Sequence, residues 1–376
     1  MKSSRTLLTL LCSLLLGAGC VDDPKKEARP PAPRPRVKPR PPTEPLGKIT
    51  VFPRQTGNPR MDRFIKEYKA AVTGNGKEKE LWDRLAARMS SSHKYPTKSW
   101  TGVHYTTLNK RKVTMDIVVP QTTGKKPPLL VWFPGGGFVM YLLGFPSGGL
   151  IAGQQGYAVA FVFYNLSTSS TGAFPAGRRS WPHALIGAKR AVRYLRDNAT
   201  KYGYDASKVV VGGFSAGGAL ASYLGATSGQ NLLEEGPKAD PKSEVHGVWI
   251  SSAVSSLDYF NPNNPKSAAR KTSWSKLYWA ITFYLGQWVD TTHAQWAVKQ
   301  ADPMGHVTNA ASKIYWIMAH GDADKVVPYE QAENMRDRLL KVGARVRLYR
   351  HKGEGHHLST VRLDRLTHMM KLVHGP

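Results

Sequence analysis

VVVGGFSAGG, at residues 209–218, is the stretch from which the fold and the chemistry of this chain can be argued. Three valines form a short β-rich run and an alanine-rich segment follows, so we expect a strand centred on 209–211 and a helix over 215–225. The five residues 213–217 fit the pattern G-x-S-x-G, in which a serine occupies a strained turn between a strand and a helix. Glycines are needed on both sides because larger side chains would collide with the neighbouring strand and helix. The sequence therefore predicts an exposed, nucleophilic hydroxyl at Ser215.

Apolar patterns on both sides of this turn predict an α/β fold. Continuous apolar runs are typical of strands buried on both faces, and alternating apolar residues are typical of half-buried strands. We expect strands at 113–119, 128–133, 157–163, 245–250, 313–318 and 346–349. Apolar residues at helical spacing predict helices at 61–71, 81–89, 183–202, 330–342 and 358–373. Strands that alternate with helices imply a mostly parallel sheet covered by helices on both faces.

A second glycine-rich stretch, LLVWFPGGGF at 129–138, follows one of the expected strands. It resembles the strand and HGGG loop of the α/β-hydrolase superfamily, in particular the esterase branch of hormone-sensitive-lipase-like and acetyl-esterase-like enzymes. The resemblance implies an oxyanion hole made by the backbone amides of Gly136, Gly137 and Ala216. Pro134 stands where the family has histidine. Because the donors are backbone groups, this departure leaves the hole possible, but it removes the usual brace of the loop.

A nucleophilic serine needs a base that is held by a carboxylate, and in this family the chain order is Ser, Asp or Glu, then His. HGDADKVVP at 320–328 follows an expected strand and looks like the family motif HGxxDxxVP, which makes Asp324 the acid. Asp322 is the alternative and is expected to cap or brace the turn. His320 is expected to be a structural partner at the end of the strand.

The base is expected in GEGHH at 353–357, after the strand at 346–349. The family pattern G-x-G-H places it at His356, with His357 as the alternative. The resemblance therefore implies a triad of Ser215, Asp324 and His356 that cleaves carboxylic esters through an acyl-enzyme, with short acyl groups such as acetyl favoured. An amide or formamide hydrolase, or an exopeptidase, would use the same triad.

This chemistry requires neither a metal nor an organic cofactor. The sequence contains no HExxH motif, and its only cysteines are Cys12 and Cys20, so a cysteine-based zinc site in the globular part is excluded. We therefore expect no cofactor.

Residues 1–20 are typical of an export signal. Lys2 and Arg5 precede an apolar run at 7–16 that is too short to span a bilayer. The run ends in LGAGC, which resembles a bacterial lipobox with Cys20 as the lipidated residue. The expected location is a lipid anchor on a bacterial membrane, periplasmic or at the cell surface. An ordinary signal peptide and a secreted protein are the alternative.

Residues 21–48 are rich in proline, arginine and lysine, and predict a disordered, extended tether. The hydrolase domain then spans 49–376, with an aromatic-rich insertion at 261–300 expected to form a helical cap or an extra packing layer.

The net charge of the whole chain suggests a different class of function, which is binding rather than catalysis. Lys and Arg number 53 against 26 Asp and Glu, a formal net charge of +27. Such an excess suits a basic envelope-binding protein that uses the fold as a scaffold, with an anionic polymer or lipid surface as partner. A solvated basic surface without a partner is the simpler alternative. No nucleic-acid-binding motif is present, and we expect no nucleic-acid partner. For the enzyme, the expected partner is a small ester or an acylated polysaccharide.

Overall fold

The computed structural model describes residues 94–141, 151–167, 180–233, 243–260, 281, 284–285, 292–357 and 361–375. The predictions for the leader with Cys20, the tether, the two helices before residue 90 and most of the insertion at 261–300 lie outside these residues. Among the described helices, none has the length and apolar character to cross a membrane.

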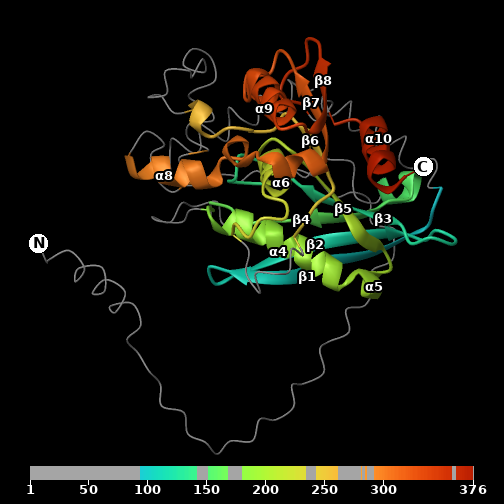
Figure 1. The fold of residues 1–376 in the computed structure, drawn as a ribbon. Helices are drawn as coiled ribbons and strands as arrows, with labels where there is room; N and C mark the ends of the chain where they lie inside the picture. The colour runs from blue at the N-terminus through green and yellow to red at the C-terminus, as the bar shows by residue number, and fades with distance from the viewer. Residues whose placement is uncertain are drawn as a thin grey trace, which may run out of the picture. The chain divides into compact units, whose positions relative to one another are not determined.

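One eight-stranded sheet, in the order β1-β2-β4-β3-β5-β6-β7-β8, organises the described residues (Figure 1). β1 pairs antiparallel with β2 and β2 antiparallel with β4, whereas every other neighbouring pair is parallel. The strands are β1 (Thr97–Leu108), β2 (Arg111–Pro120), β3 (Pro128–Phe133), β4 (Ala158–Val162), β5 (Asp205–Phe214), β6 (Gly247–Ser251), β7 (Tyr315–Gly321) and β8 (Arg345–His351). Strands β3, β4, β6 and β7 are almost wholly buried, and so is β5 from Val209 onward, as continuous apolar runs require.

The helices flank this sheet and connect its parallel strands. They are α4 (His183–Asp197), α5 (Ala199–Tyr202), α6 (Ala216–Ala226), α8 (Thr292–Ala301), α9 (Glu330–Lys341) and α10 (Leu363–His374). Short helical turns are η2 (Ile151–Gln155), η3 (Asp258–Phe260), η5 (Met304–His306) and η6 (Asn309–Lys313).

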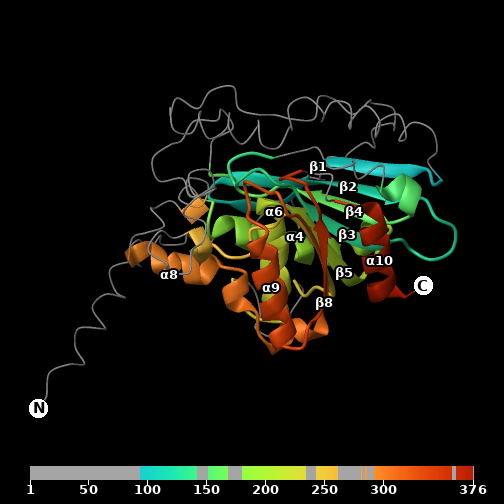
Figure 2. The ribbon, with the colours of Figure 1, turned by 90° about the horizontal axis from the view of Figure 1, so that it is seen from above.

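Two neighbouring residues of β6 show that both faces of the sheet are covered. Successive side chains of a strand point to opposite faces. A Cβ added at Gly247 would lie 2.6 Å from Met369 Sδ of α10, whereas one added at Gly225 of α6 would lie 2.5 Å from Val248 Cγ2. α10 and α6 therefore pack on opposite faces. Figure 2 shows α4, α6 and α9 on one side of the sheet and α10 on the other.

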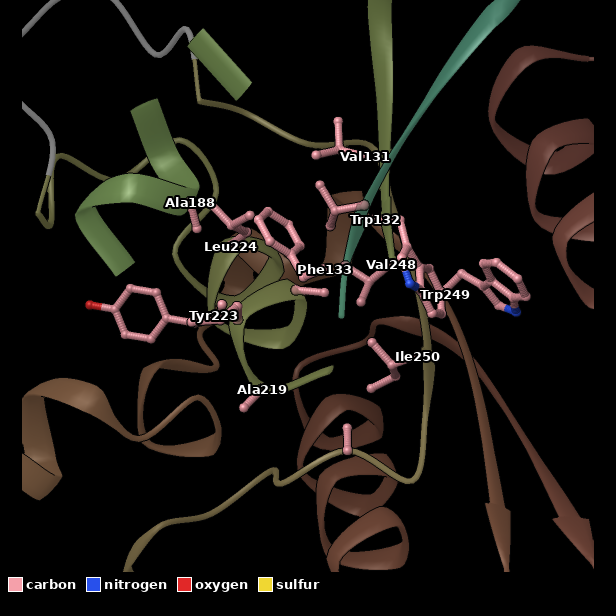
Figure 3. Close-up of a cluster of buried hydrophobic side chains, with 14 of the residues drawn as sticks. Val131, Trp132, Phe133, Ala188, Ala219, Tyr223, Leu224, Val248, Trp249 and Ile250 are labelled. Atoms are coloured by element: carbon pink, nitrogen blue, oxygen red, sulfur yellow. The ribbon is translucent and has the colours of Figure 1, made fainter. Parts of the chain in front are cut away.

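The core includes a close contact where β3, β5 and β6 lie side by side. Gly212 of β5 pairs with Trp132 on one side and Trp249 on the other, and the two indole rings lie 5.2 Å apart. A Cβ at Gly212 would lie 3.0 Å from Trp132 Cε3 and 2.8 Å from the Trp249 carbonyl oxygen, so the bare glycine lets the indoles meet across the strand. Figure 3 shows this cluster, with Val131, Trp132, Phe133, Ala188, Ala219, Tyr223, Leu224, Val248, Trp249 and Ile250 labelled.

The predicted fold class is confirmed: the sheet is mostly parallel and helices cover both faces. The strand expected at 128–133 coincides with β3. The single helix expected over 183–202 is wrong, because it is interrupted at Asn198 and divides into α4 and α5. Asn198 donates from its side chain to the Tyr194 carbonyl, a local hydrogen bond that competes with helix continuation.

Candidate active site

Ser215 lies in the turn between β5 and α6, as the sequence predicts. Its backbone adopts φ 54° and ψ −119°, a conformation that is strained for a residue with a side chain. A Cβ at Gly213 would lie 2.4 Å from the Gly217 carbonyl carbon, and one at Gly217 would lie 2.1 Å from the Phe133 oxygen. Because these neighbours are backbone atoms that cannot move aside, the two glycines allow strand, turn and helix to approach this closely.

His356 lies between Ser215 and Asp324. Ser215 Oγ is 3.0 Å from His356 Nε2, and His356 Nδ1 is 2.7 Å from Asp324 Oδ2. The serine follows β5, the aspartate follows β7 and the histidine follows β8, so all three lie at the carboxyl ends of parallel strands. The prediction of an exposed serine is wrong: Ser215 is 1% exposed and His356 is 2% exposed, because strand, loop and helix pack closely around them, and this burial isolates their hydrogen bonds from bulk water. The structure thus joins residues 141 and 32 positions apart in the chain.

The Asp324 carboxylate is held by four groups. Oδ1 accepts the backbone N–H groups of Val326 and Val327, each at 2.8 Å, while Oδ2 faces His356 and lies 3.2 Å from His320 Nε2. Burial alone would raise the pKa of this carboxyl. The charge of His356 and the hydrogen bonds from the two histidines outweigh burial and hold the pKa of Asp324 well below its ordinary value. Asp324 is therefore ionised whenever the protein is folded near neutral pH.

The two alternative residues occupy other places. Asp322 Oδ2 accepts Arg350 Nε at 2.8 Å and its Oδ1 accepts the Gly353 N–H at 2.6 Å. It therefore braces the turn after β8, whereas the sequence indicated a brace of its own turn after β7. The Gly353 hydrogen bond, followed by that of Arg350, lowers the pKa of Asp322. His356, rather than His357, lies between the serine and the aspartate.

His320 contacts the carboxylate directly, in addition to being a structural partner at the end of β7. Its Nε2 is 2.8 Å from the Val327 carbonyl oxygen, in the same loop that donates two N–H groups to Asp324. His320 is 1% exposed. It therefore fixes the loop and the carboxylate together.

The glycine-rich loop after β3 lies against the nucleophile. A Cβ at Gly135 would be 3.3 Å from Ser215 Cβ, and Gly136 and Gly137 have φ of 128° and 62°, in the region that favours glycine. Ala216 is the first residue of α6. In the part of the chain that the structure describes, the N–H groups of Gly136, Gly137 and Ala216 donate to no acceptor. Amides without an acceptor, on a loop that touches Ser215 and at the start of the helix that follows it, are available to donate to a further group.

A pair of buried polar side chains supports the loop after β6, and nothing in the sequence indicated it. Gln331 Oε1 accepts the N–H groups of Ser255 and Ser256 at 2.9 and 2.8 Å, and Asp302 Oδ1 accepts that of Leu257 at 3.0 Å. The same loop donates the Val254 N–H to the Ser215 carbonyl. Because these contacts join residues up to 76 positions apart, no local motif could reveal them.

The stability of the protein should fall as the pH rises from about 4 to 7 because of Asp302. Burial, which the Leu257 N–H only partly offsets, raises the pKa of this carboxyl to about 7. In the unfolded chain it ionises near pH 4, so over this range the folded state binds more protons and loses stability with rising pH, by on the order of 4 kcal/mol. Urea unfolding of the wild type and of Asp302→Asn at several pH values measures the difference. Equal pH dependence in both proteins would contradict this prediction.

Among the described residues, no group of three His, Cys, Asp or Glu side chains is arranged to hold a metal ion.

The described end of the aromatic insertion includes α8, in which Trp296 is 58% exposed and packs edge-on against Trp181, with ring centres 5.4 Å apart.

A family model described as BD-FAE matches residues 115–339 of the chain. This range is more than half of the chain and contains the glycine-rich loop, Ser215 and Asp324. The chain belongs to the BD-FAE family. In this BD-FAE chain His356 lies beyond the end of the match, so the histidine is assigned from the structure and the local motif.

Two relatives of the chain are esterases of Mycobacterium tuberculosis. Esterase LipC of Mycobacterium tuberculosis is 26% identical over 225 residues, which cover 58% of this chain and 49% of LipC. Esterase LipQ of the same organism is 23% identical over 234 residues, covering 62% of this chain and 51% of LipQ. The BD-FAE chain thus spans about half the length of the curated relatives it matches. These relatives and the family match support the prediction of a carboxylic-ester hydrolase.

Solved structures support the fold of the BD-FAE chain. An acetyl ester-xyloside bifunctional hydrolase from Caldicellulosiruptor lactoaceticus has a TM-score of 0.51 at 22% identity, covering 70% of this chain and 88% of that one.

Proposed function

We propose that this chain is a serine hydrolase that cleaves carboxylic esters with short acyl groups through an acyl-enzyme. The observation that carries the proposal is the buried relay from Ser215 through His356 to Asp324, with heavy-atom distances of 3.0 and 2.7 Å. Nucleophile, base and orienting carboxylate within hydrogen-bond reach are the arrangement that acyl transfer to a hydroxyl requires.

Each residue has a defined role in the proposed reaction. Ser215 Oγ attacks the acyl carbonyl carbon while His356 Nε2 takes its proton and then gives it to the departing alcohol. Asp324 accepts the Nδ1–H of His356, which fixes the tautomer and stabilises the imidazolium. The oxyanion binds to the amides of Gly136, Gly137 and Ala216. A water molecule, activated by His356, then releases the acid and restores the serine.

The proposed natural substrate is an acylated polysaccharide. Its support is indirect: one solved structure of similar fold is titled a carbohydrate esterase from gut microbiota, and another an acetyl ester-xyloside hydrolase. An amide or formamide hydrolase, or an exopeptidase, would use the same relay. We also propose that Cys20 carries a lipid and that residues 21–48 tether the domain to a bacterial membrane, on the sequence features alone.

Hydrolysis of p-nitrophenyl esters from acetate to decanoate tests the proposed activity, with Ser215→Ala as the control. We expect turnover that is highest for acetate to butyrate and is absent from the control. Turnover of a p-nitroanilide but of no ester, by folded protein, would replace the esterase by an amidase.

A cavity at the other end of β5 favours a second function, binding of an acidic polysaccharide. The cavity of about 860 Å³ is lined by Lys125, Lys126, Arg196, Lys371 and His374, with Asp205 the acidic residue among its lining. Asp205 begins β5 and Ser215 follows its end, so ten residues of strand put the two sites on the order of 30 Å apart. The chain's net charge of +27 adds long-range attraction for a polyanion.

Polygalacturonate, an acidic polysaccharide, serves as the probe. Its binding should persist in Ser215→Ala and weaken with added salt. The Lys125→Gln/Lys126→Gln protein should bind several-fold more weakly and keep its ester hydrolysis. Unchanged binding in the lysine variant would contradict a role for this cavity.

A further inference from the structure

The loop that carries Gly136 and Gly137 is held in a costly conformation. Gly136, Gly137 and Phe138 all have positive φ, at 128°, 62° and 62°. For Phe138, which has a side chain, this left-handed conformation costs about 1–2 kcal/mol. Pro134, at the start of the loop, has no N–H and no polar side chain with which to hold itself. Within the loop the Gly136 carbonyl accepts the N–H groups of Val139 and Met140, each at 3.1 Å, but these bonds leave Pro134 without support, which must come from outside the loop.

Tyr164 makes the contact at the start of the loop. Its Oη donates to the Pro134 carbonyl oxygen at 2.9 Å, and the residue is 1% exposed. The Tyr164 ring also packs edge-on against that of Phe138, with centres 6.5 Å apart. One side chain thus contacts the residues on either side of Gly136 and Gly137, at Pro134 and at Phe138.

The segment that carries Tyr164 is itself fixed from several sides. The Tyr141 hydroxyl donates to the Tyr164 carbonyl, and the Tyr105 hydroxyl donates to that of Phe163 at 2.8 Å. Ser167 returns to the loop by donating its N–H to the Phe138 carbonyl at 2.9 Å. Residues 163–167 therefore form a rigid support beneath the loop.

We propose that Tyr164 is a positioning residue that sets the oxyanion loop through the Pro134 carbonyl. This inference rests on the proposed function, because it concerns the same site. Donors aid catalysis only when they lie close to the place where negative charge develops, and shifts well below 1 Å weaken them. The tyrosine hydroxyl supplies here the anchor that Pro134 cannot supply from its own side chain.

Tyr164→Phe tests the proposal because it removes one oxygen atom and keeps the ring. We expect kcat for p-nitrophenyl butyrate to fall about 10- to 100-fold, with KM changed less than about threefold, since the loss acts on the transition state. The pH profile of kcat/KM should stay unchanged, because the relay of Ser215, His356 and Asp324 is untouched.

Tyr204→Phe is a matched control. Tyr204 is also 1% exposed, and its Oη also donates to a backbone carbonyl, that of Leu195 at 2.8 Å, far from the oxyanion loop. Both variants leave one buried carbonyl without its donor, so they should lose similar stability, about 1–3 kcal/mol. Only Tyr164→Phe should lose kcat.

A trifluoromethyl ketone provides a second measurement, because Ser215 adds to it to form an oxyanion that occupies the hole. Its inhibition constant should rise in Tyr164→Phe in proportion to the fall in kcat/KM, and stay unchanged in Tyr204→Phe. If Tyr164→Phe does not fold, Tyr141→Phe tests the proposal instead. It removes the hydroxyl that donates to the Tyr164 carbonyl, so it should loosen Tyr164 and lower kcat severalfold. Equal kcat in the tested tyrosine variant and the control would overturn the proposal. Activity that survives in Ser215→Ala would instead overturn the proposed function.

Discussion

Replacing Ser215 by alanine is expected to lower kcat for p-nitrophenyl esters by about 10⁴- to 10⁶-fold. The hydroxyl is the nucleophile of the proposed reaction. His356, the general base, does not form the acyl-enzyme in its place. The folded structure should be unaffected, because alanine removes one oxygen atom from a turn whose geometry is set by the flanking glycines. Steady-state kinetics on purified proteins, with unfolding curves in parallel, measure both effects.

Adding His356→Ala to the same experiment tests whether Ser215 and His356 act together. Serine and histidine act as one unit, so the double variant should be no slower than either single variant, and their effects should be far from additive. Ser222→Ala is the matched control, because Ser222 is also a buried serine and lies within α6, seven residues after Ser215. It should keep nearly full activity. Additive losses at Ser215 and His356 would contradict the relay.

Replacing Gly217 by alanine is expected to have the largest effect on stability. The new Cβ would lie 2.1 Å from the Phe133 oxygen and 2.5 Å from that of Pro134, both backbone atoms. Helix α6 would have to move away from β3, opening a tightly packed core. We expect the free energy of unfolding to fall by at least about 3 kcal/mol and Tm by on the order of 10 °C. Activity should fall as well, because the movement separates Ser215 from the oxyanion loop.

Gly187→Ala in α4 separates this effect from that of glycine replacement in general. There the nearest atoms to a new Cβ are Leu108 Cδ1 at 3.3 Å, the end of a side chain that can adjust, and Tyr105 Oη at 3.4 Å, an ordinary van der Waals contact that lets this hydroxyl stay in place. Helix propensity favours alanine by about 1 kcal/mol, so stability should change little or rise. A Gly217→Ala protein as stable as wild type would show that the close approach of α6 and β3 is not needed.

The strands that the sequence predicted well are those whose burial leaves a simple pattern. β3 and the second half of β5, from Val209 onward, are buried and contain no charged residue because neighbouring strands and helices cover both faces, and their residues alone indicate this. β1 was not expected, because it is an edge strand with many exposed polar residues, and its residues do not alternate cleanly. Its position depends on pairing with β2, which a local pattern cannot report.

In the candidate site, too, the sequence could indicate some residues and not others. Ser215, Asp324 and His356 lie in local motifs next to strands, so the sequence could indicate them before their contacts were known. Tyr164 and Asp302 lie in no such motif. Their importance comes from single hydrogen bonds to distant backbone atoms, at Pro134 and Leu257, and those contacts exist only once the chain is folded.

The position of β8 at an edge of the sheet ties activity to a part of the fold that is less protected than the central strands. β8 pairs with β7 alone and is partly exposed, and it leads directly into the turn that carries His356. Strand edges with few buried contacts open at a lower free energy than the centre of a sheet. Fraying of β8 would take the histidine away from Ser215 while β3 to β6 remain paired. Molecules in this state would keep nearly the circular dichroism of the native fold but would be inactive. Turnover therefore reports whether the β8 edge is intact, rather than whether the whole domain is folded.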